Sequence, residues 1–136
     1  MENYTIKDLS IGMTATMSKT VTEADIVLFA GVTGDFNPAH IDAEYAAQSM
    51  FKERIAHGML SAGFISATLA MKMPGPGSIY LSQNLKFKAP VKIGDTVKTT
   101  VTITDINEKR KIIQLETNCS VGDTVVVVGE ASLMKP

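Results

Sequence analysis

The chain has 136 residues, 45% of them apolar and 20% charged, which is typical of a folded protein with one hydrophobic core. Its formal net charge of −1, and the absence of a Lys and Arg cluster interleaved with aromatic residues, argue against a nucleic acid partner. Cys119 is the only cysteine, which excludes an intramolecular disulfide and any metal site built on paired thiolates.

The chain begins with a strand signal and a helix signal. Residues 14–21 form a short stretch suited to a strand. Residues 22–25 then resemble a capping sequence, and they predict a helix that Gly34 should end.

A loop, a second short helix and a long helix are expected next. Residues 35–40 contain the Asp, Asn and Pro that are typical of a loop, and Asp42 is suited to cap a helix over residues 44–49. Residues 58–73 are apolar or small on almost every side, which predicts a core helix that is buried all round. The two prolines and two glycines of residues 74–77 should stop it.

The second half of the chain carries strand signals. Four runs are suited to strands: residues 78–87, 96–106, 111–120 and 124–133. Apolar and polar residues alternate best in the middle two, and residues 107–110 and 121–124 are typical of turns between antiparallel neighbours. Residues 125–128 do not alternate, which indicates a strand covered on both faces.

This order of elements predicts one α+β domain over residues 1–136, in which an antiparallel sheet curls around the helix of residues 58–73. Such a sheet leaves an edge strand exposed. Because a dimer that joins two sheets edge to edge would remove that edge, we expect a homodimer or a higher homo-oligomer.

The polar residues Asp35, Asn37 and His40 are concentrated around Pro38. Taken alone, this spacing favours a simple explanation, in which Asp35 and Asn37 make turn hydrogen bonds and His40 is a solvated surface histidine.

A resemblance that covers nearly the whole chain changes this interpretation. Residues 34–40, Gly-Asp-Phe-Asn-Pro-Ala-His, resemble the signature of the (R)-specific enoyl-CoA hydratases, in the MaoC-like family of hot-dog folds. Residues 55–60 resemble the family's entry to its central helix, and residues 74–80 and 83–91 resemble its following loop and strand. Ala39 departs from the pattern, because relatives usually carry Leu, Ile or Val there, and this bears on pocket shape.

The resemblance implies roles for individual residues. Asp35 and His40 are expected to be the catalytic pair, holding one water against the double bond of an enoyl thioester as base and acid. Asn37 is expected to hold the loop or the substrate thioester region, its role as a turn residue being nearly as plausible. The backbone N–H of Gly58, at the start of a helix, is expected to stabilise the oxyanion. His57 is expected to cap or pack rather than to react.

The implied reaction is reversible syn addition of water to trans-2-enoyl-CoA, giving (R)-3-hydroxyacyl-CoA. It needs no metal and no cofactor, since CoA is part of the substrate. Three alternatives stay open: dehydration of a 3-hydroxyacyl group on CoA or acyl carrier protein, thioester hydrolysis, and a non-catalytic acyl-thioester-binding module.

The N-terminal residues lack the basic start and the apolar run of a secretory signal, and no stretch has the length of a membrane span. We therefore expect a cytoplasmic protein that does not enter the membrane.

Overall fold

The computed structural model describes residues 3–136, which form a short N-terminal turn, a strand, four helices and four further strands. The elements are the 3-10 turn η1 (Ile6–Asp8), the helices α1 (Glu23–Thr33), α2 (Pro38–Ile41), α3 (Ala43–Ala47) and α4 (Gly58–Met71), and the strands β1 (Thr14–Thr20), β2 (Ile79–Phe87), β3 (Thr96–Asn107), β4 (Ile112–Val121) and β5 (Thr124–Met134). The expected α+β order is confirmed.

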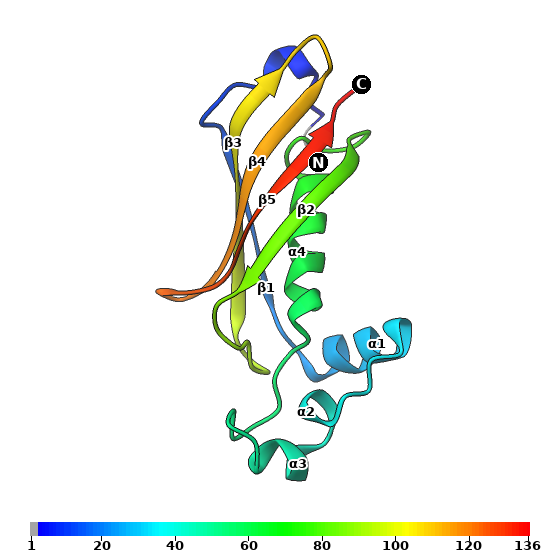
Figure 1. Cartoon of the computed structure of the whole chain (residues 1–136), viewed down its shortest axis with the longest axis vertical. Helices are drawn as coiled ribbons and strands as arrows, with labels where there is room; N and C mark the ends of the chain where they lie inside the picture. Colours follow the sequence, from blue (N-terminus) through cyan, green and yellow to red (C-terminus); the bar gives the residue numbers. More distant parts are fainter. Residues whose placement is uncertain (1–2) are drawn as a thin grey trace.

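The five strands form one antiparallel sheet in the order β1-β3-β4-β5-β2, and the sheet curls along α4 (Figure 1). Both expected hairpins are present. In the tighter one, Val121 pairs with Thr124, and Gly122 takes the positive φ of 56° that such a turn requires. This arrangement of sheet and helix is the expected hot-dog architecture.

The hydrophobic core lies between α4 and the concave face of the sheet. Alternate residues of β3, such as Val97, Val101 and Ile103, are fully buried, as the period of two predicts. From α4, Ile65 and Leu69 fill the same core. Burial of each such side chain contributes about 1.5–3 kcal/mol to folding.

The expectation that the long helix is buried all round is wrong for the single chain. The side chains of Met59 and Met71 are 56% and 43% exposed, because the sheet covers only one side of α4. The helix also ends at Met71 rather than at residue 73, since a residue that precedes a proline disfavours helical backbone angles. None of the described helices combines the length and apolarity that crossing a membrane requires.

Two further sequence predictions need correction. Residues 38–41 are helical where a loop was expected, because Pro38 suits the first helical position and Asn37 caps the turn. Asp42 caps α3 as predicted, although α3 ends at Ala47 rather than at residue 49. Near the start of β5, Val126 and Val127 are buried, but Val125 is 47% exposed, so this strand is covered on both faces only in part.

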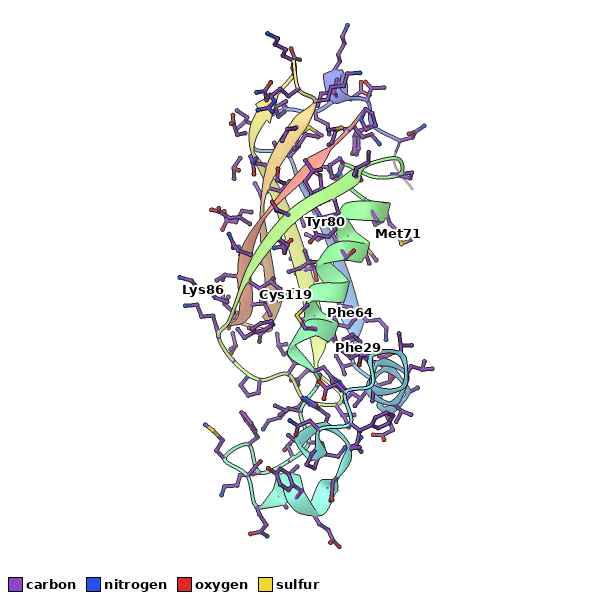
Figure 2. All side chains as sticks on the ribbon, turned by 45° about the vertical axis from the view of Figure 1, so that its right-hand side comes forward. Phe29, Phe64, Met71, Tyr80, Lys86 and Cys119 are labelled. Atoms are coloured by element: carbon purple, nitrogen blue, oxygen red, sulfur yellow. The ribbon has the colours of Figure 1, made fainter. Side chains whose placement is uncertain are left out.

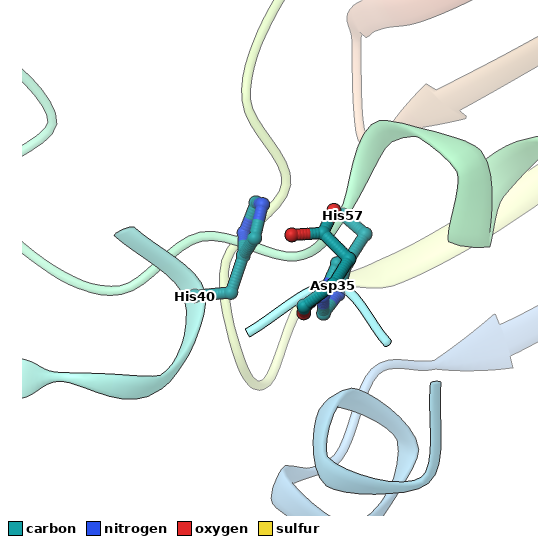
Figure 3. Close-up of side chains that lie close together, drawn as sticks. All are labelled: Asp35, His40 and His57. Carbon is teal, nitrogen blue, oxygen red and sulfur yellow. Dashed lines mark hydrogen bonds between the residues drawn. The ribbon is translucent and has the colours of Figure 1, made fainter. Parts of the chain in front are cut away.

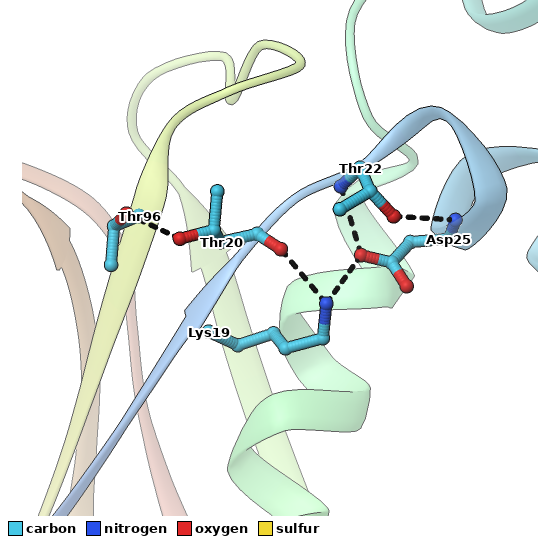
Figure 4. Close-up of polar contacts among 5 residues, drawn as sticks. All are labelled: Lys19, Thr20, Thr22, Asp25 and Thr96. Atoms are coloured by element: carbon cyan, nitrogen blue, oxygen red, sulfur yellow. Dashed lines mark hydrogen bonds and ion pairs between the residues drawn. The ribbon is translucent and has the colours of Figure 1, made fainter.

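Helix α1 is joined to β1 by a polar network (Figure 4). Thr22 and Asp25 form the expected capping box, and the Lys19 ammonium lies 2.6 Å from the Asp25 carboxylate. The hydrogen bond from Lys19 is the largest cause that lowers the pKa of Asp25. Gly34 ends α1 with a φ of 81°, as predicted, so this network fixes the helix that leads directly into Asp35.

Candidate active site

Asp35 and His40 meet beside the N-terminus of α4. Asp35 directly follows the end of α1 and His40 lies on α2, and one carboxylate oxygen of Asp35 is directed toward the His40 ring (Figure 3). One side-chain nitrogen or oxygen atom from each of Asp35, His40 and His57 lies within 4.8 Å of the others. The structure therefore brings the predicted pair together and adds a second histidine.

The segment before α4 orients His40. The His40 Nδ1 atom lies 2.8 Å from the carbonyl oxygen of Ile55, and because a carbonyl only accepts, Nδ1 carries the proton. In a neutral ring this leaves the lone pair on Nε2 free for another partner. Arg54 donates from Nε to the His40 carbonyl at 2.6 Å, and its guanidinium pairs with Glu23 of α1 at 2.9 Å.

Asp35 is held by its own turn. Its Oδ1 atom accepts a hydrogen bond of 3.1 Å from the backbone N–H of Asn37, and its own N–H donates to the Thr33 hydroxyl. Among residues 3–136, no hydrogen bond reaches the second carboxylate oxygen. Asp35 is solvent-exposed, so that oxygen is open to a water or a substrate.

The contacts of His57 with Asp35 and His40 were not predicted from the sequence. His57 makes no capping hydrogen bond, and only 2% of it is exposed. Its ring stacks on His40 with centroids 3.9 Å apart, and its Nε2 lies 2.9 Å from the backbone oxygen of Asp35. It therefore packs, as expected, but against both members of the pair. Arg54 was missed too, since nothing in its local sequence pattern links it to His40.

Gly58, the first residue of α4, lines a cavity of about 420 Å³ together with His40 and His57. The first N–H groups of a helix lack intrahelical acceptors, so the Gly58 N–H is available to a ligand. A Cβ atom on Gly58 would lie 2.9 Å from the Phe87 ring, so a larger residue at this position would require that ring or the helix start to shift. Within the described residues, Lys88 is the only lysine or arginine that lines the cavity.

The side chain of Asn37 stabilises the loop that leads into α2. Its Oδ1 atom accepts the N–H of Ala39 at 3.0 Å and thereby caps α2. Asn37 and Asp35 are not among the residues that line the cavity, although Asp35 lies at its margin beside His40. A role of Asn37 in substrate binding stays a prediction, as do the catalytic roles of the other site residues.

A second, larger groove lies on the exposed side of α4. It has a volume of about 660 Å³, and its lining comes from α1, α4 and β2, including Phe29, Met59, Ser66 and Tyr80. Figure 2 places Tyr80 near the upper part of α4 and Phe29 near its lower end. The surroundings are apolar enough that burial raises the pKa of Tyr80.

The cluster of Asp35, His40 and His57 has the residue types of a metal site but not its geometry. An imidazole binds a metal ion in the plane of its ring, at about 2.0–2.1 Å from nitrogen for zinc. The His40 and His57 rings are stacked at 26° to each other. The nitrogen lone pairs lie in the two ring planes, so a lone pair from each ring cannot be directed at the same metal ion. The arrangement suits acid–base chemistry better than metal binding.

Comparison with known proteins identifies the family of this chain. The MaoC like domain matches residues 10–125. The (R)-specific enoyl-CoA hydratase of Rhodospirillum rubrum is 54% identical over 96% of this chain and 90% of its own length. The 3-hydroxybutyryl-CoA dehydratase of Methylorubrum extorquens is 45% identical over 96% of this chain and 83% of its own.

Among solved structures, the unliganded (R)-hydratase of Pseudomonas aeruginosa superimposes with a TM-score of 0.94 at 44% identity, covering 98% of this chain and 86% of that one. The match of the domain includes the whole segment from Asp35 to Gly58 that builds the site. The chain therefore belongs to the MaoC-like domain family, with the hot-dog fold of the (R)-hydratases.

Proposed function

We propose that this protein is an (R)-specific enoyl-CoA hydratase, a hydro-lyase that adds water reversibly to trans-2-enoyl-CoA and gives (R)-3-hydroxyacyl-CoA. The observation that carries the proposal is the convergence of Asp35 and His40, within 4.8 Å, beside the N-terminus of α4. The names of the relatives from R. rubrum and M. extorquens, which describe the two directions of such a reaction, support it.

One water fits between Asp35 and His40 in this mechanism. Two hydrogen bonds of about 2.8 Å that meet at one oxygen at a tetrahedral angle span roughly 4.5 Å. This span is compatible with the limit of 4.8 Å within which one side-chain atom of Asp35 and one of His40 lie. The free carboxylate oxygen of Asp35 and Nε2 of His40 are the atoms available to hold it. The pair removes one proton from the water as its oxygen bonds to C3, and it returns one proton to C2. Both additions occur from the side of the pair, so the hydration is syn.

The Gly58 N–H supplies the second requirement of the reaction. Attack at C3 moves negative charge onto the thioester oxygen, and a free N–H at a helix N-terminus stabilises such charge. Gly58 lines the same cavity as His40, which supports binding of the thioester there. One water, one acid–base pair and one oxyanion donor account for every proton and charge, so the proposed chemistry calls for no metal and no cofactor beyond the CoA of the substrate.

The proposal includes a homodimer joined along β2. This strand pairs with β5 on one side, and within residues 3–136 its other edge is unpaired. Exposed apolar side chains gather on β2 and the adjoining face of α4: Met59, Met71, Ile79, Tyr80 and Leu81. A second copy would cover this apolar surface and remove the open edge.

Sedimentation analysis tests the dimer. We expect twice the mass of the chain for the wild type, and the chain mass for Leu81→Glu, which places a charge at the β2 edge. A wild-type monomer would contradict this part of the proposal without affecting the fold.

The activity is tested with purified protein and a short enoyl-CoA. We expect the ultraviolet absorbance of the conjugated thioester to fall, and chiral analysis of the product to find the (R) alcohol. No loss of absorbance, together with unchanged substrate, would contradict the proposal, and release of a free thiol would indicate thioester hydrolysis instead.

Two finer points belong to the same proposal. Offering the substrate on CoA and on acyl carrier protein separates a CoA enzyme from a carrier-protein dehydratase, and we expect faster turnover on CoA. The proposal includes a cytoplasmic setting. It is supported by the single cysteine of the chain, Cys119, which is a free thiol and cannot form an intramolecular disulfide.

A further inference from the structure

We propose that His57 is a positioning residue that fixes the geometry between Asp35 and His40, and that it does so as a neutral ring protonated on Nε2. The effect of His57 on catalysis rests on the proposed function, whereas its protonation state does not. It concerns a residue outside the catalytic pair, and it assigns to His57 a hydrogen bond on one side and a stacking contact on the other.

The hydrogen bond holds Asp35. Nε2 of His57 lies 2.9 Å from the backbone oxygen of Asp35, which is an acceptor only, so Nε2 is the donor. Asp35 is solvent-exposed and follows Gly34, whose φ of 81° ends α1. The hydrogen bond from the buried His57 ring therefore holds the backbone of Asp35 next to the start of α4.

The stacking contact holds His40. The two rings lie 3.9 Å apart at 26°, and Phe29 of α1 contacts His57 with a centroid distance of 4.8 Å. The His40 ring is thus fixed in two ways, by its bond from Nδ1 to Ile55 along the ring edge and by His57 against its face. Together these contacts leave the His40 ring little freedom to rotate away from Asp35.

The protonation state follows from the other nitrogen. Nδ1 of His57 is buried and has no hydrogen-bond partner among residues 3–136. A charged ring would place a second N–H there with no acceptor, which is strongly unfavourable in a buried position. A neutral ring leaves Nδ1 as a bare lone pair. With Nδ1 buried and Nε2 bonded to Asp35, neither nitrogen is available to exchange protons with a substrate.

Nitrogen NMR of the histidine rings tests the protonation state without reference to activity. The chain contains two histidines, so the ring signals of His57 can be assigned by their loss in a single variant. We expect His57 to show a protonated Nε2 and a bare Nδ1 in the folded protein at neutral pH. A ring protonated on Nδ1, or on both nitrogens, would overturn the proposal even if the protein proved not to be a hydratase.

Two variants separate the contacts in a kinetic test. His57→Gln retains a donor near Nε2 and loses the aromatic face, whereas His57→Phe retains the face and loses the donor. Because displacement of catalytic groups by about 1 Å is costly, we expect each to lower kcat roughly 10- to 100-fold while KM stays within about twofold. We also expect His57→Gln to change the pH profile of kcat, since His40 loses its stacking partner.

Thr68→Val is the matched control. Thr68 is fully buried in the same helix and its hydroxyl donates to the Phe64 carbonyl, so the variant also removes a buried side-chain to backbone hydrogen bond. We expect a lower melting temperature and an unchanged kcat and pH profile.

The proposal is overturned if both His57 variants lose stability but keep the kcat and pH profile of the wild type, if only KM changes, or if both lose as much activity as His40→Gln. A wild type without activity would contradict the proposed function instead.

Discussion

The two ends of α4 lie in different surroundings. Towards its C-terminal end, Ile65 and Leu69 pack into a core whose strand residues, such as Leu115 and Val101, are completely buried. At its N-terminus, Gly58 and His57 meet an exposed segment that carries Asp35. The core is held by many similar apolar contacts, whereas the site depends on a few individual hydrogen bonds and one ring stack. Substitutions should therefore affect stability at one end and chemistry at the other.

We expect the largest loss of turnover without a loss of stability for Asp35→Asn and His40→Gln. Asp35 is exposed and His40 is partly exposed, so neither substitution leaves a large void in the core. Loss of a positioned acid or base lowers turnover by roughly 10²- to 10⁴-fold. We expect this loss in kcat for each variant, with the melting temperature within a few degrees of the wild type. Turnover near that of the wild type in either variant would contradict its assigned role.

Leu115→Ala tests the opposite end of the comparison. Leu115 is 0% exposed within the core, and truncation of such a leucine costs about 2–5 kcal/mol of stability. We expect a large fall in the free energy of unfolding, measured with denaturant. Because Leu115 does not line the cavity beside Asp35 and His40, we expect the kcat of the folded fraction to stay within about twofold of the wild type. A selective loss of kcat would show that the two ends are coupled.

Gly58→Ala should produce an intermediate effect at the boundary between the two regions. The new methyl group would lie 2.9 Å from the Phe87 ring, which must move or shift the helix start. Because oxyanion donors act only when well placed, we expect kcat to fall by roughly tenfold to a hundredfold. Gly31→Ala in α1 is the control, since its Cβ would meet nothing within 4 Å. That variant should retain full activity and gain about 0.5–1 kcal/mol of stability.

Asp25→Asn should produce the smallest effect. Asp25 completes the capping box of α1 and pairs with Lys19, and loss of such contacts costs about 1 kcal/mol. The pKa of Asp25 is lowered in the folded protein, so its contribution is full above the unfolded pKa of about 3.9 and disappears as the pH falls through the folded pKa. We therefore expect the stability difference between wild type and variant to shrink below about pH 4. A difference that does not change with pH would contradict the pairing with Lys19.

The sequence predicted the core better than the site. Alternation identified β3 and β4, and the run of apolar residues identified α4, because both patterns repeat over many residues. The exposed face of α4 was not predicted, since the pattern does not show how many sides a sheet will cover.

At the site, the motif and its resemblance predicted Asp35, His40 and Gly58. They did not predict the contacts of Arg54 and His57 with the segment of residues 35–40, which join parts of the chain 14 to 22 residues apart. No local spacing encodes such contacts, and they become visible only when α1 and α4 are in place. The helix α2 was missed for a related reason, because a proline and an asparagine favour a loop and a helix start equally well.

The most direct test of the shared water is a double-mutant cycle on Asp35 and His40. If both residues act on one water, removal of the second partner costs little once the first is gone. We predict that the kcat of the double variant Asp35→Asn, His40→Gln will be close to that of the more impaired single variant. Losses that multiply, so that the double variant falls by the product of the two single effects, would show that the residues act independently and would contradict the mechanism.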